Sequence, residues 1–230
     1  MVPVGPSMKK SVVAAFLFLL CLGPAGAQNR LVYREQTGPR VALVEVTEKH
    51  EGEDLLLRTV MSYGESYEIL NDSDMATLSF SYGNTAENTF YTARREGDSI
   101  RMEGTLRGRT FSRLSRVDPH PLYESVERSL QGFAISGSTQ TLDFWMVLPT
   151  EAQVFQMVAR REGLDRVQVA GAAVSAERVK VSLPGIAALL WSSLYWFRPS
   201  DGTFLRSEAV RGIGLGIPKS VLELVEGEKL

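Results

Sequence analysis

The segment Asn88–Arg116 reads NTFYTARREGDSIRMEGTLRGRTFSRLSR and has the clearest strand pattern of the chain. The pairs Gly97-Asp98 and Arg107-Gly108 divide it into three short runs that mix polar, β-branched and aromatic residues. Short runs of this composition, joined by two-residue turns that contain glycine, are typical of β-hairpins. The segment therefore predicts three antiparallel strands in a meander.

The same pattern extends on both sides of this segment. Strand-like runs separated by turn residues occupy Val41–Glu48, Asp54–Tyr63, Glu65–Leu70, Met75–Tyr82, Thr141–Leu148, Val154–Glu162, Val167–Ala170, Val174–Leu183, Leu194–Arg198, Phe204–Gly212 and Ser220–Val225. We expect Gly163 to end one of these strands, and Pro199-Ser200-Asp201-Gly202 to form a hairpin turn. Strands do not alternate regularly with helices, which favours an antiparallel sheet over a parallel one.

One amphipathic helix is predicted between the two groups of strands. Its apolar stripe at helical spacing consists of Leu122, Val126, Leu130 and Phe133. Gly132 is expected to mark its end, and Glu124, Glu127 and Arg128 are expected to face water. A helix of this length needs a partner surface. The predicted fold is mainly β, a curved, half-barrel-like antiparallel sheet with one amphipathic helix packed on it.

The N-terminal region resembles a secretory signal peptide. Lys9-Lys10 precedes the apolar run Ser11–Leu22, and Ala25-Gly26-Ala27 gives the small-residue pattern of a cleavage site. The run is too short to span a bilayer comfortably, although an uncleaved anchor is the alternative. We therefore expect residues 1–27 to be a signal peptide and residues 28–230 a single antiparallel β domain without a transmembrane segment.

The compartment follows from this leader and from the cysteine content. The only cysteine, Cys21, lies in the leader, so the mature chain has no disulfide. Acylation of Cys21 is not expected, because Leu20 precedes it where a lipoprotein signal has a small residue. We expect an exported bacterial protein, located in the periplasm or associated with the outer membrane.

The composition narrows the classes of function. Without a leader that carries two lysines and no acidic residue, 203 residues remain with 23 basic and 27 acidic side chains. Such a mixed, mildly acidic surface argues against nucleic-acid binding. His50 and His120 have no ligand-spaced partner, so no metal site and no cofactor are predicted. The glycine-rich segment Gly212–Gly216 lacks the spacing of a phosphate-binding loop.

No nucleophile motif or carboxylate pair stands out either. The expectation is a protein that is not an enzyme and has no catalytic residues.

The concentration of aromatic residues is the unusual feature. All three tryptophans lie in two segments, and the candidate ligand-binding residues there are Phe144, Trp145, Trp191, Tyr195 and Trp196. Alternation in the second segment places Trp191, Tyr195 and Phe197 on one face, with Leu190, Leu194 and Trp196 on the other. One interpretation is a strand buried on both faces. The other is that one face lines an apolar groove for a ligand.

Several stretches of the second half resemble a family of exported bacterial proteins of unknown function. They are Pro121–Ser125, Phe144–Val147, Val169–Gly171, Val179–Val181 and Tyr195–Gly202, where an aromatic strand leads into an Asp-Gly turn. Such proteins are similar in architecture to the periplasmic lipoprotein carriers, whose curved sheet encloses an apolar cavity. The resemblance implies this architecture and no catalytic residue.

The leading functional hypothesis is non-catalytic binding of a lipid or another apolar envelope ligand. The alternative is an envelope assembly or interaction module that has no small-molecule ligand and pairs with an envelope protein through a sheet edge. A carboxylate-dependent hydrolase ranks below both. An apolar cavity beside the tryptophans would favour the first hypothesis, and a filled core with a long exposed edge would favour the second.

Overall fold

The computed structural model describes residues 29–210 and 219–226. In these residues fourteen strands form one antiparallel sheet. The strands are β1 (Asn29–Thr37), β2 (Arg40–Glu51), β3 (Asp54–Met61), β4 (Glu65–Asn71), β5 (Thr77–Asn84), β6 (Thr89–Glu96), β7 (Ser99–Leu106), β8 (Arg109–Arg116), β9 (Thr141–Leu148), β10 (Gln153–Val169), β11 (Ala172–Ser182), β12 (Ser192–Phe197), β13 (Phe204–Val210) and β14 (Lys219–Glu226). The helical elements are α1 (Val126–Ser129), α2 (Gln131–Ser136) and the 3₁₀ turn η1 (Gly185–Leu189).

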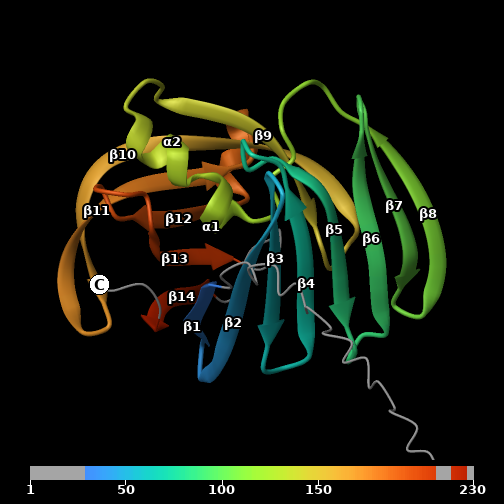
Figure 1. Cartoon of the computed structure of the whole chain (residues 1–230), viewed down its shortest axis with the longest axis horizontal. Helices are drawn as coiled ribbons and strands as arrows, with labels where there is room; N and C mark the ends of the chain where they lie inside the picture. Colours follow the sequence, from blue (N-terminus) through green and yellow to red (C-terminus); the bar gives the residue numbers. More distant parts are fainter. Residues whose placement is uncertain (1–28, 211–218, 227–230) are drawn as a thin grey trace, which may run out of the picture.

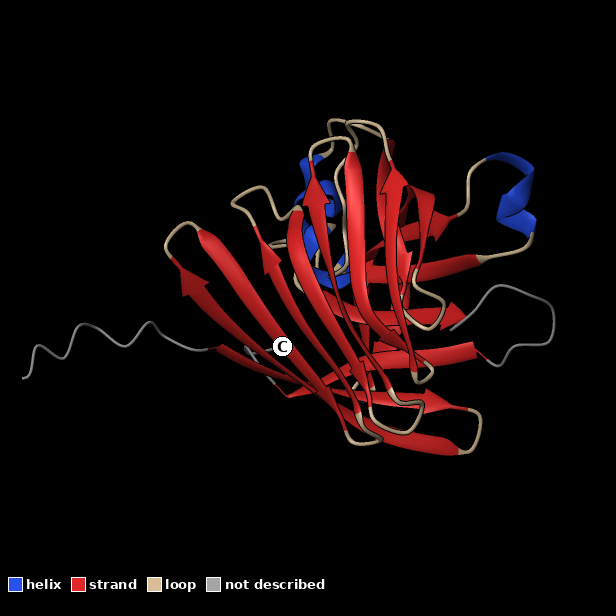
Figure 2. Cartoon of the chain, turned by 90° about the vertical axis from the view of Figure 1, so that its right-hand side faces the viewer, coloured by secondary structure: helices blue, strands red, loops and turns tan. Residues whose placement is uncertain are grey.

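The sheet has the order β8-β7-β6-β5-β4-β3-β2-β1-β14-β13-β12-β11-β10-β9. Neighbours in the sheet are neighbours in the chain except where β1 pairs with β14, so β8 and β9 are the two edges. In Figure 1 the strands β3–β8 run almost at right angles to β12 and β13, which shows how strongly the sheet curves. The helices α1 and α2 lie between the two halves (Figure 2). The mainly β fold, with one short helical segment on a curved sheet, is as the sequence predicts.

The meander predicted for Asn88–Arg116 is confirmed as β6, β7 and β8. Arg107 and Gly108 both have positive φ, at 49° and 75°, as a tight two-residue turn of type I′ requires. Ile100 and Met102 of β7 are fully buried on one face. Hairpin turns and alternation therefore fix both the pairing and the register of this half of the sheet.

Two strands differ from the prediction. The sequence pattern does not indicate β1, because both faces of the segment Leu31–Tyr33 are apolar and give no alternation. Gly163 does not end β10, which continues to Val169. Instead the register with β11 shifts between Arg161 and Gly163, and Gly163 has a φ of 89°. The glycine provides a β-bulge, which bends a long strand without terminating it.

The helical segment begins later than its apolar stripe. Tyr123 donates its N–H to the Trp145 carbonyl at 2.8 Å, and Trp145 donates to the Pro121 carbonyl at 2.7 Å. These bonds hold the residues before α1 in an extended conformation against the β9 edge. Gly137 in the left-handed conformation, not Gly132, caps the C-terminus of α2. The stripe itself is confirmed, since its four residues Leu122, Val126, Leu130 and Phe133 are all buried.

A buried polar network fixes α1 to the first half of the sheet. The Asn71 amide donates to Ser125 Oγ at 2.8 Å and accepts from Thr77 Oγ1 at 2.9 Å. Ser129 Oγ donates to the Met75 carbonyl at 2.8 Å. Paired polar groups in a core hold a specific geometry, because leaving any of them unpaired is costly. The helix is thus held in place by hydrogen bonds as well as by apolar packing.

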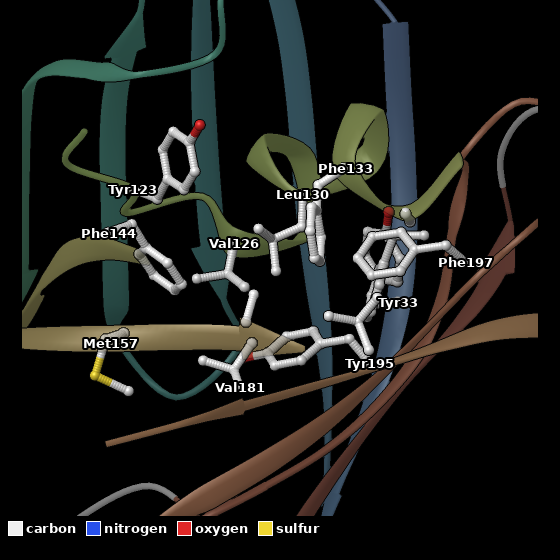
Figure 3. Close-up of a cluster of buried hydrophobic side chains, with 14 of the residues drawn as sticks. Tyr33, Tyr123, Val126, Leu130, Phe133, Phe144, Met157, Val181, Tyr195 and Phe197 are labelled. Atoms are coloured by element: carbon white, nitrogen blue, oxygen red, sulfur yellow. The ribbon is translucent and has the colours of Figure 1, made fainter. Parts of the chain in front are cut away.

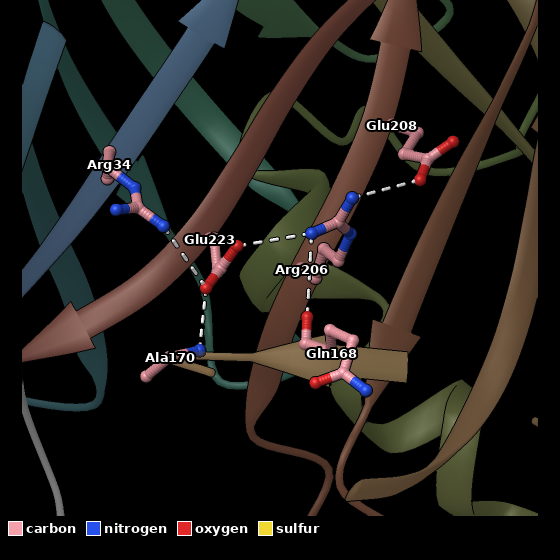
Figure 4. Close-up of polar contacts among 6 residues, drawn as sticks. All are labelled: Arg34, Gln168, Ala170, Arg206, Glu208 and Glu223. Carbon is pink, nitrogen blue, oxygen red and sulfur yellow. Dashed lines mark hydrogen bonds and ion pairs between the residues drawn. The ribbon is translucent and has the colours of Figure 1, made fainter. Parts of the chain in front are cut away.

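The tip of the β10–β11 hairpin folds against β13 and β14. Glu223 accepts the Ala170 N–H at 2.6 Å and pairs with Arg206 at 3.1 Å and Arg34 at 3.6 Å (Figure 4). Beside these contacts, Trp196 packs in a small apolar cluster with residues of this hairpin tip, such as Val169. The contacts explain why β12 is apolar on both faces.

Other predictions cannot be placed in this structure. The signal peptide 1–27 and the glycine-rich segment Gly212–Gly216 lie outside the described residues. None of the helices in the described ranges has the length and apolar character needed to cross a membrane.

Candidate functional site

An apolar cavity of about 260 Å³ lies between α1 and the concave face of the sheet. Strands β1–β4 form one wall, α1 forms another, and β9, β12 and β14 complete it. Its apolar lining consists of Leu31, Tyr33, Val44, Val46, Leu57, Met61, Tyr67, Ile69, Val126, Met146, Val147, Pro149, Tyr195 and Leu222. The cavity thus lies where α1 faces strands from both halves of the sheet.

A second cavity of about 330 Å³ adjoins the first. Tyr67, Met146, Pro149 and Tyr195 line both, so the two spaces share a wall. The second cavity adds Trp191, among other apolar residues from β10 and from the segment around η1. Ligand pockets usually measure about 300–1,000 Å³ and have mainly apolar walls. The two cavities together have the size and character of such a pocket.

Figure 3 shows the packed side that borders the cavity. Val126 and Leu130 project from the helical segment between strands of the two halves, and Tyr195 lies among them. Phe204 joins the aromatic residues there, with its ring 5.5 Å from Tyr33 and 6.2 Å from Tyr195. These aromatic contacts form the wall beside β1 and β12.

Two carboxyl groups face the cavity from the helical segment. Glu124 Oε1 accepts the Val147 N–H at 2.5 Å. Burial raises the pKa of Glu124 well above its ordinary value, and this hydrogen bond opposes the rise. Burial also raises the pKa of Glu127. Both groups line the cavity and are only partly exposed, so their charged forms are less well solvated than in water.

The prediction that Glu124, Glu127 and Arg128 face water is therefore wrong for the two glutamates, whereas the Arg128 side chain remains 30% exposed. Glu124 precedes α1 in the extended segment, so the helical period does not apply to it. Glu127 and Arg128 lie on a single turn of helix that is surrounded by the curved sheet, and both line the cavity.

A third carboxylate, Glu48 of β2, lies at the same cavity. Arg128 Nη2 is 3.5 Å from Glu48 Oε2, and Arg128 Nη1 donates to Gln131 Oε1 at 2.7 Å. The Glu48 side chain is only 9% exposed. Arg128 is thus the cationic residue at the end of the cavity where Glu48 and Glu127 lie.

Two tyrosines complete this polar end. Burial raises the pKa of the Tyr33 hydroxyl, and the nearby Glu127 and Glu48 raise it further. Burial followed by Glu127 raises the pKa of Tyr195. Both tyrosines stay protonated at neutral pH, so they offer the cavity neutral aromatic rings.

The five aromatic candidates from the sequence do not all meet here. Trp191 and Tyr195 line the cavities. Phe144 is fully buried in the core, and Trp196 packs on the opposite face of β12. Trp145 donates its indole N–H to Asp118 at 2.7 Å, outside both cavity linings. The predicted division of β12 into two faces is confirmed by the separate clusters of Tyr195 and Trp196.

Sequence reasoning missed the acidic residues at the cavity. The signal for Glu48 was present, because Val44, Val46 and Glu48 alternate on one face of β2 and Val44 is buried. No comparable signal marked Glu124 or Glu127. Their position depends on where the helix begins, which hydrogen bonds to a distant strand decide.

The histidines lie apart from this site. His120 Nδ1 is 2.8 Å from Asp118, which also accepts the Trp145 indole, and His50 lies near the end of β2. Within residues 29–210 and 219–226, no group of three or more His, Asp and Glu side chains is placed to hold a metal ion.

Comparison with known proteins finds no family model and no curated protein that matches this chain. Among solved structures, a DUF1329 family protein from Desulfovibrio piger is similar at a TM-score of 0.28 and 11% identity. The similarity covers 86% of this chain and 83% of that one. At this level the likeness supports no statement about function.

Proposed function

We propose that this protein is an exported, non-catalytic binding protein that holds a lipid or another apolar envelope molecule between α1 and the concave face. The observation that carries the proposal is the pair of adjoining apolar cavities lined by Tyr195, Met146 and Trp191. Burial of apolar surface contributes about 25 cal/mol per Å². An acyl chain would gain most of its binding free energy from these walls.

The position of the cavity supports this proposal. Buried side chains border it, and the hydrogen bond from Asn71 to Ser125 fixes the start of α1 to β4. A space held open by a fixed scaffold is preorganised for a ligand, which lowers the entropic cost of binding. Glu124 is engaged with the Val147 backbone, so the proposal gives it a structural role and no catalytic one.

An interaction module pairing through a sheet edge is the second candidate, and β8 is the observation that favours it. Six of its eight residues are exposed, and it forms one end of the sheet. However, Arg109, Arg113 and Arg116 lie along this strand, and charged residues on an edge discourage pairing with another chain. The cavity is the better supported of the two sites.

The test is native mass spectrometry of residues 28–230, purified gently from the protein's own envelope. The proposal expects an added mass of several hundred daltons that organic extraction removes. Val46→Phe would narrow the cavity and abolish the added mass. Val41→Phe lies on the same strand but is 60% exposed, so it should retain the added mass. A bare mass for the unaltered protein, or an added mass unaffected by Val46→Phe, would overturn the proposal.

A further inference from the structure

Glu127 is a carboxyl group of the cavity that has no side-chain partner among the described residues. Its carboxyl accepts a hydrogen bond from its own backbone N–H. Within the described ranges, no side chain of another residue donates to it or forms an ion pair with it. It lies on α1 and lines the cavity of about 260 Å³ beside Tyr33 and Tyr195. A carboxylate without a partner in an apolar setting is costly, because water no longer solvates it.

Several elements that line the cavity place charged or titratable groups near Glu127. Glu48 comes from β2, Glu124 from the segment before α1, Arg128 from α1, and the neutral hydroxyls of Tyr33 and Tyr195 from β1 and β12. Both Nη atoms of Arg128 are engaged, by Glu48 and Gln131, while its buried Nε has no hydrogen-bond partner in the described part of the chain. Three carboxyl groups therefore face one guanidinium, so this end of the cavity has an excess of hydrogen-bond acceptors over cations.

We propose that the cavity selects an amphiphile with a cationic head, whose ammonium group lies against Glu127 while its alkyl chain follows the apolar walls. This inference rests on the proposed function and adds the class of ligand. A cation would supply the partner that Glu127 lacks, and the rings of Tyr33 and Tyr195 can face it as well. An anionic head would add a like charge beside Glu48 and Glu127, and a neutral head would leave the carboxyl unpaired.

The inference predicts a specific pH dependence. A permanent cation favours the ionised form of Glu127, so binding at low pH must release the proton from this carboxyl. Affinity for such a ligand then rises with pH, by at most about tenfold per pH unit for one group. A neutral amphiphile does not favour the ionised form of Glu127, so its affinity should not rise with pH in this way.

The experiment compares decyltrimethylammonium, 1-decanol and decanoate on lipid-free residues 28–230, with binding measured by calorimetry and by tryptophan fluorescence. We expect decyltrimethylammonium to bind at least about tenfold more tightly than 1-decanol at pH 8, a difference of about 1.4 kcal/mol. The preference should shrink toward pH 5, and decanoate should bind most weakly at pH 8. Glu127→Gln should remove the preference but retain 1-decanol binding. Glu53→Gln, an exposed change in the β2–β3 turn, should change neither the preference for decyltrimethylammonium nor the binding of 1-decanol.

The outcomes separate the two proposals. Equal binding of the cationic and neutral probes, tighter binding of decanoate, or an unchanged preference in Glu127→Gln would overturn the cationic inference and leave the proposed function standing. Failure of all three probes to bind the unaltered protein would count against the proposed function itself.

Discussion

Val147 donates its backbone N–H to the carboxyl group of Glu124 across 2.5 Å. Val147 lies on the edge strand β9, where alternate backbone groups have no neighbouring strand. Together with the bonds between Trp145 and the segment Pro121–Tyr123, this contact covers the edge. Covered edges resist pairing with other chains. One acidic residue thus protects a sheet edge and also forms part of the cavity wall.

Glu124→Gln is expected to change how stability depends on pH. Because burial raises the pKa of Glu124, the folded protein keeps this proton at pH values where the unfolded chain, with a pKa of about 4.3, has lost it. The free energy of unfolding therefore falls as pH rises above that value. Glutamine can still accept the Val147 N–H but does not ionise. The variant should be more stable than the unaltered protein at pH 8, by about 1.4 kcal/mol per unit of pKa elevation removed.

Thermal unfolding at pH 4 and pH 8 measures this effect. At pH 4 the two proteins should have similar melting temperatures, and Glu53→Gln serves as the exposed control. Each kcal/mol corresponds to about 2–4 °C for a domain of this size. An equal loss of stability at both pH values would contradict the prediction.

Leu130→Ala tests the apolar stripe of the helical segment. Leu130 is fully buried between α1 and α2, in the core cluster that contains Val126 and Phe133. Truncation of a buried leucine costs about 2–5 kcal/mol, since it removes apolar contacts and leaves a void. Leu189→Ala is the matched control, because Leu189 is 82% exposed on η1, and it should change stability by less than about 0.5 kcal/mol. The free energy of unfolding is measured in urea. If both variants lower it equally, the helical segment does not stabilise the fold.

Local sequence signals were sufficient for much of this fold. The turn at Arg107-Gly108 and the alternation around Ile100 and Met102 indicated the meander, and the stripe around Leu130 indicated the buried helical face. What they could not supply were contacts between residues far apart in sequence. The start of α1 depends on Trp145, and Gly163 forms a bulge because β11 continues beside it.

The candidate site was predictable only in part, for the same reason. Tyr195 and Trp191 were identified from their aromatic clustering and alternation, and they line the cavities. Phe144 and Trp196 belong to the same sequence clusters but pack elsewhere, because composition does not distinguish a core face from a cavity wall. Glu127 required the three-dimensional arrangement, since a polar residue on a short helix normally faces water.

The Asn71–Ser125 pair tests whether the buried network holds α1 in position. Asn71→Ala leaves the hydroxyls of Thr77 and Ser125 without their partner, and unsatisfied buried groups cost about 1–3 kcal/mol. Ser125→Ala breaks the same contact from the other side. The double variant should therefore cost less than the sum of the single variants, by about 0.5–3 kcal/mol in a double-mutant cycle. Strict additivity in urea unfolding would show that the two residues act independently.

Gly104→Ala should be the more damaging of two glycine substitutions in the same meander. Gly104 lies in β7 opposite Tyr91, with a φ of 149°, and a Cβ added there would collide with the Phe90 carbonyl oxygen. Gly97 has a φ of 59°, and a Cβ added there would have no other atom within 4 Å. Gly97→Ala therefore costs only the left-handed backbone strain of about 1–2 kcal/mol, whereas Gly104→Ala must also displace the backbone of β6. Denaturant unfolding of the two variants measures the difference, and equal stability would show that β6 and β7 can separate without penalty.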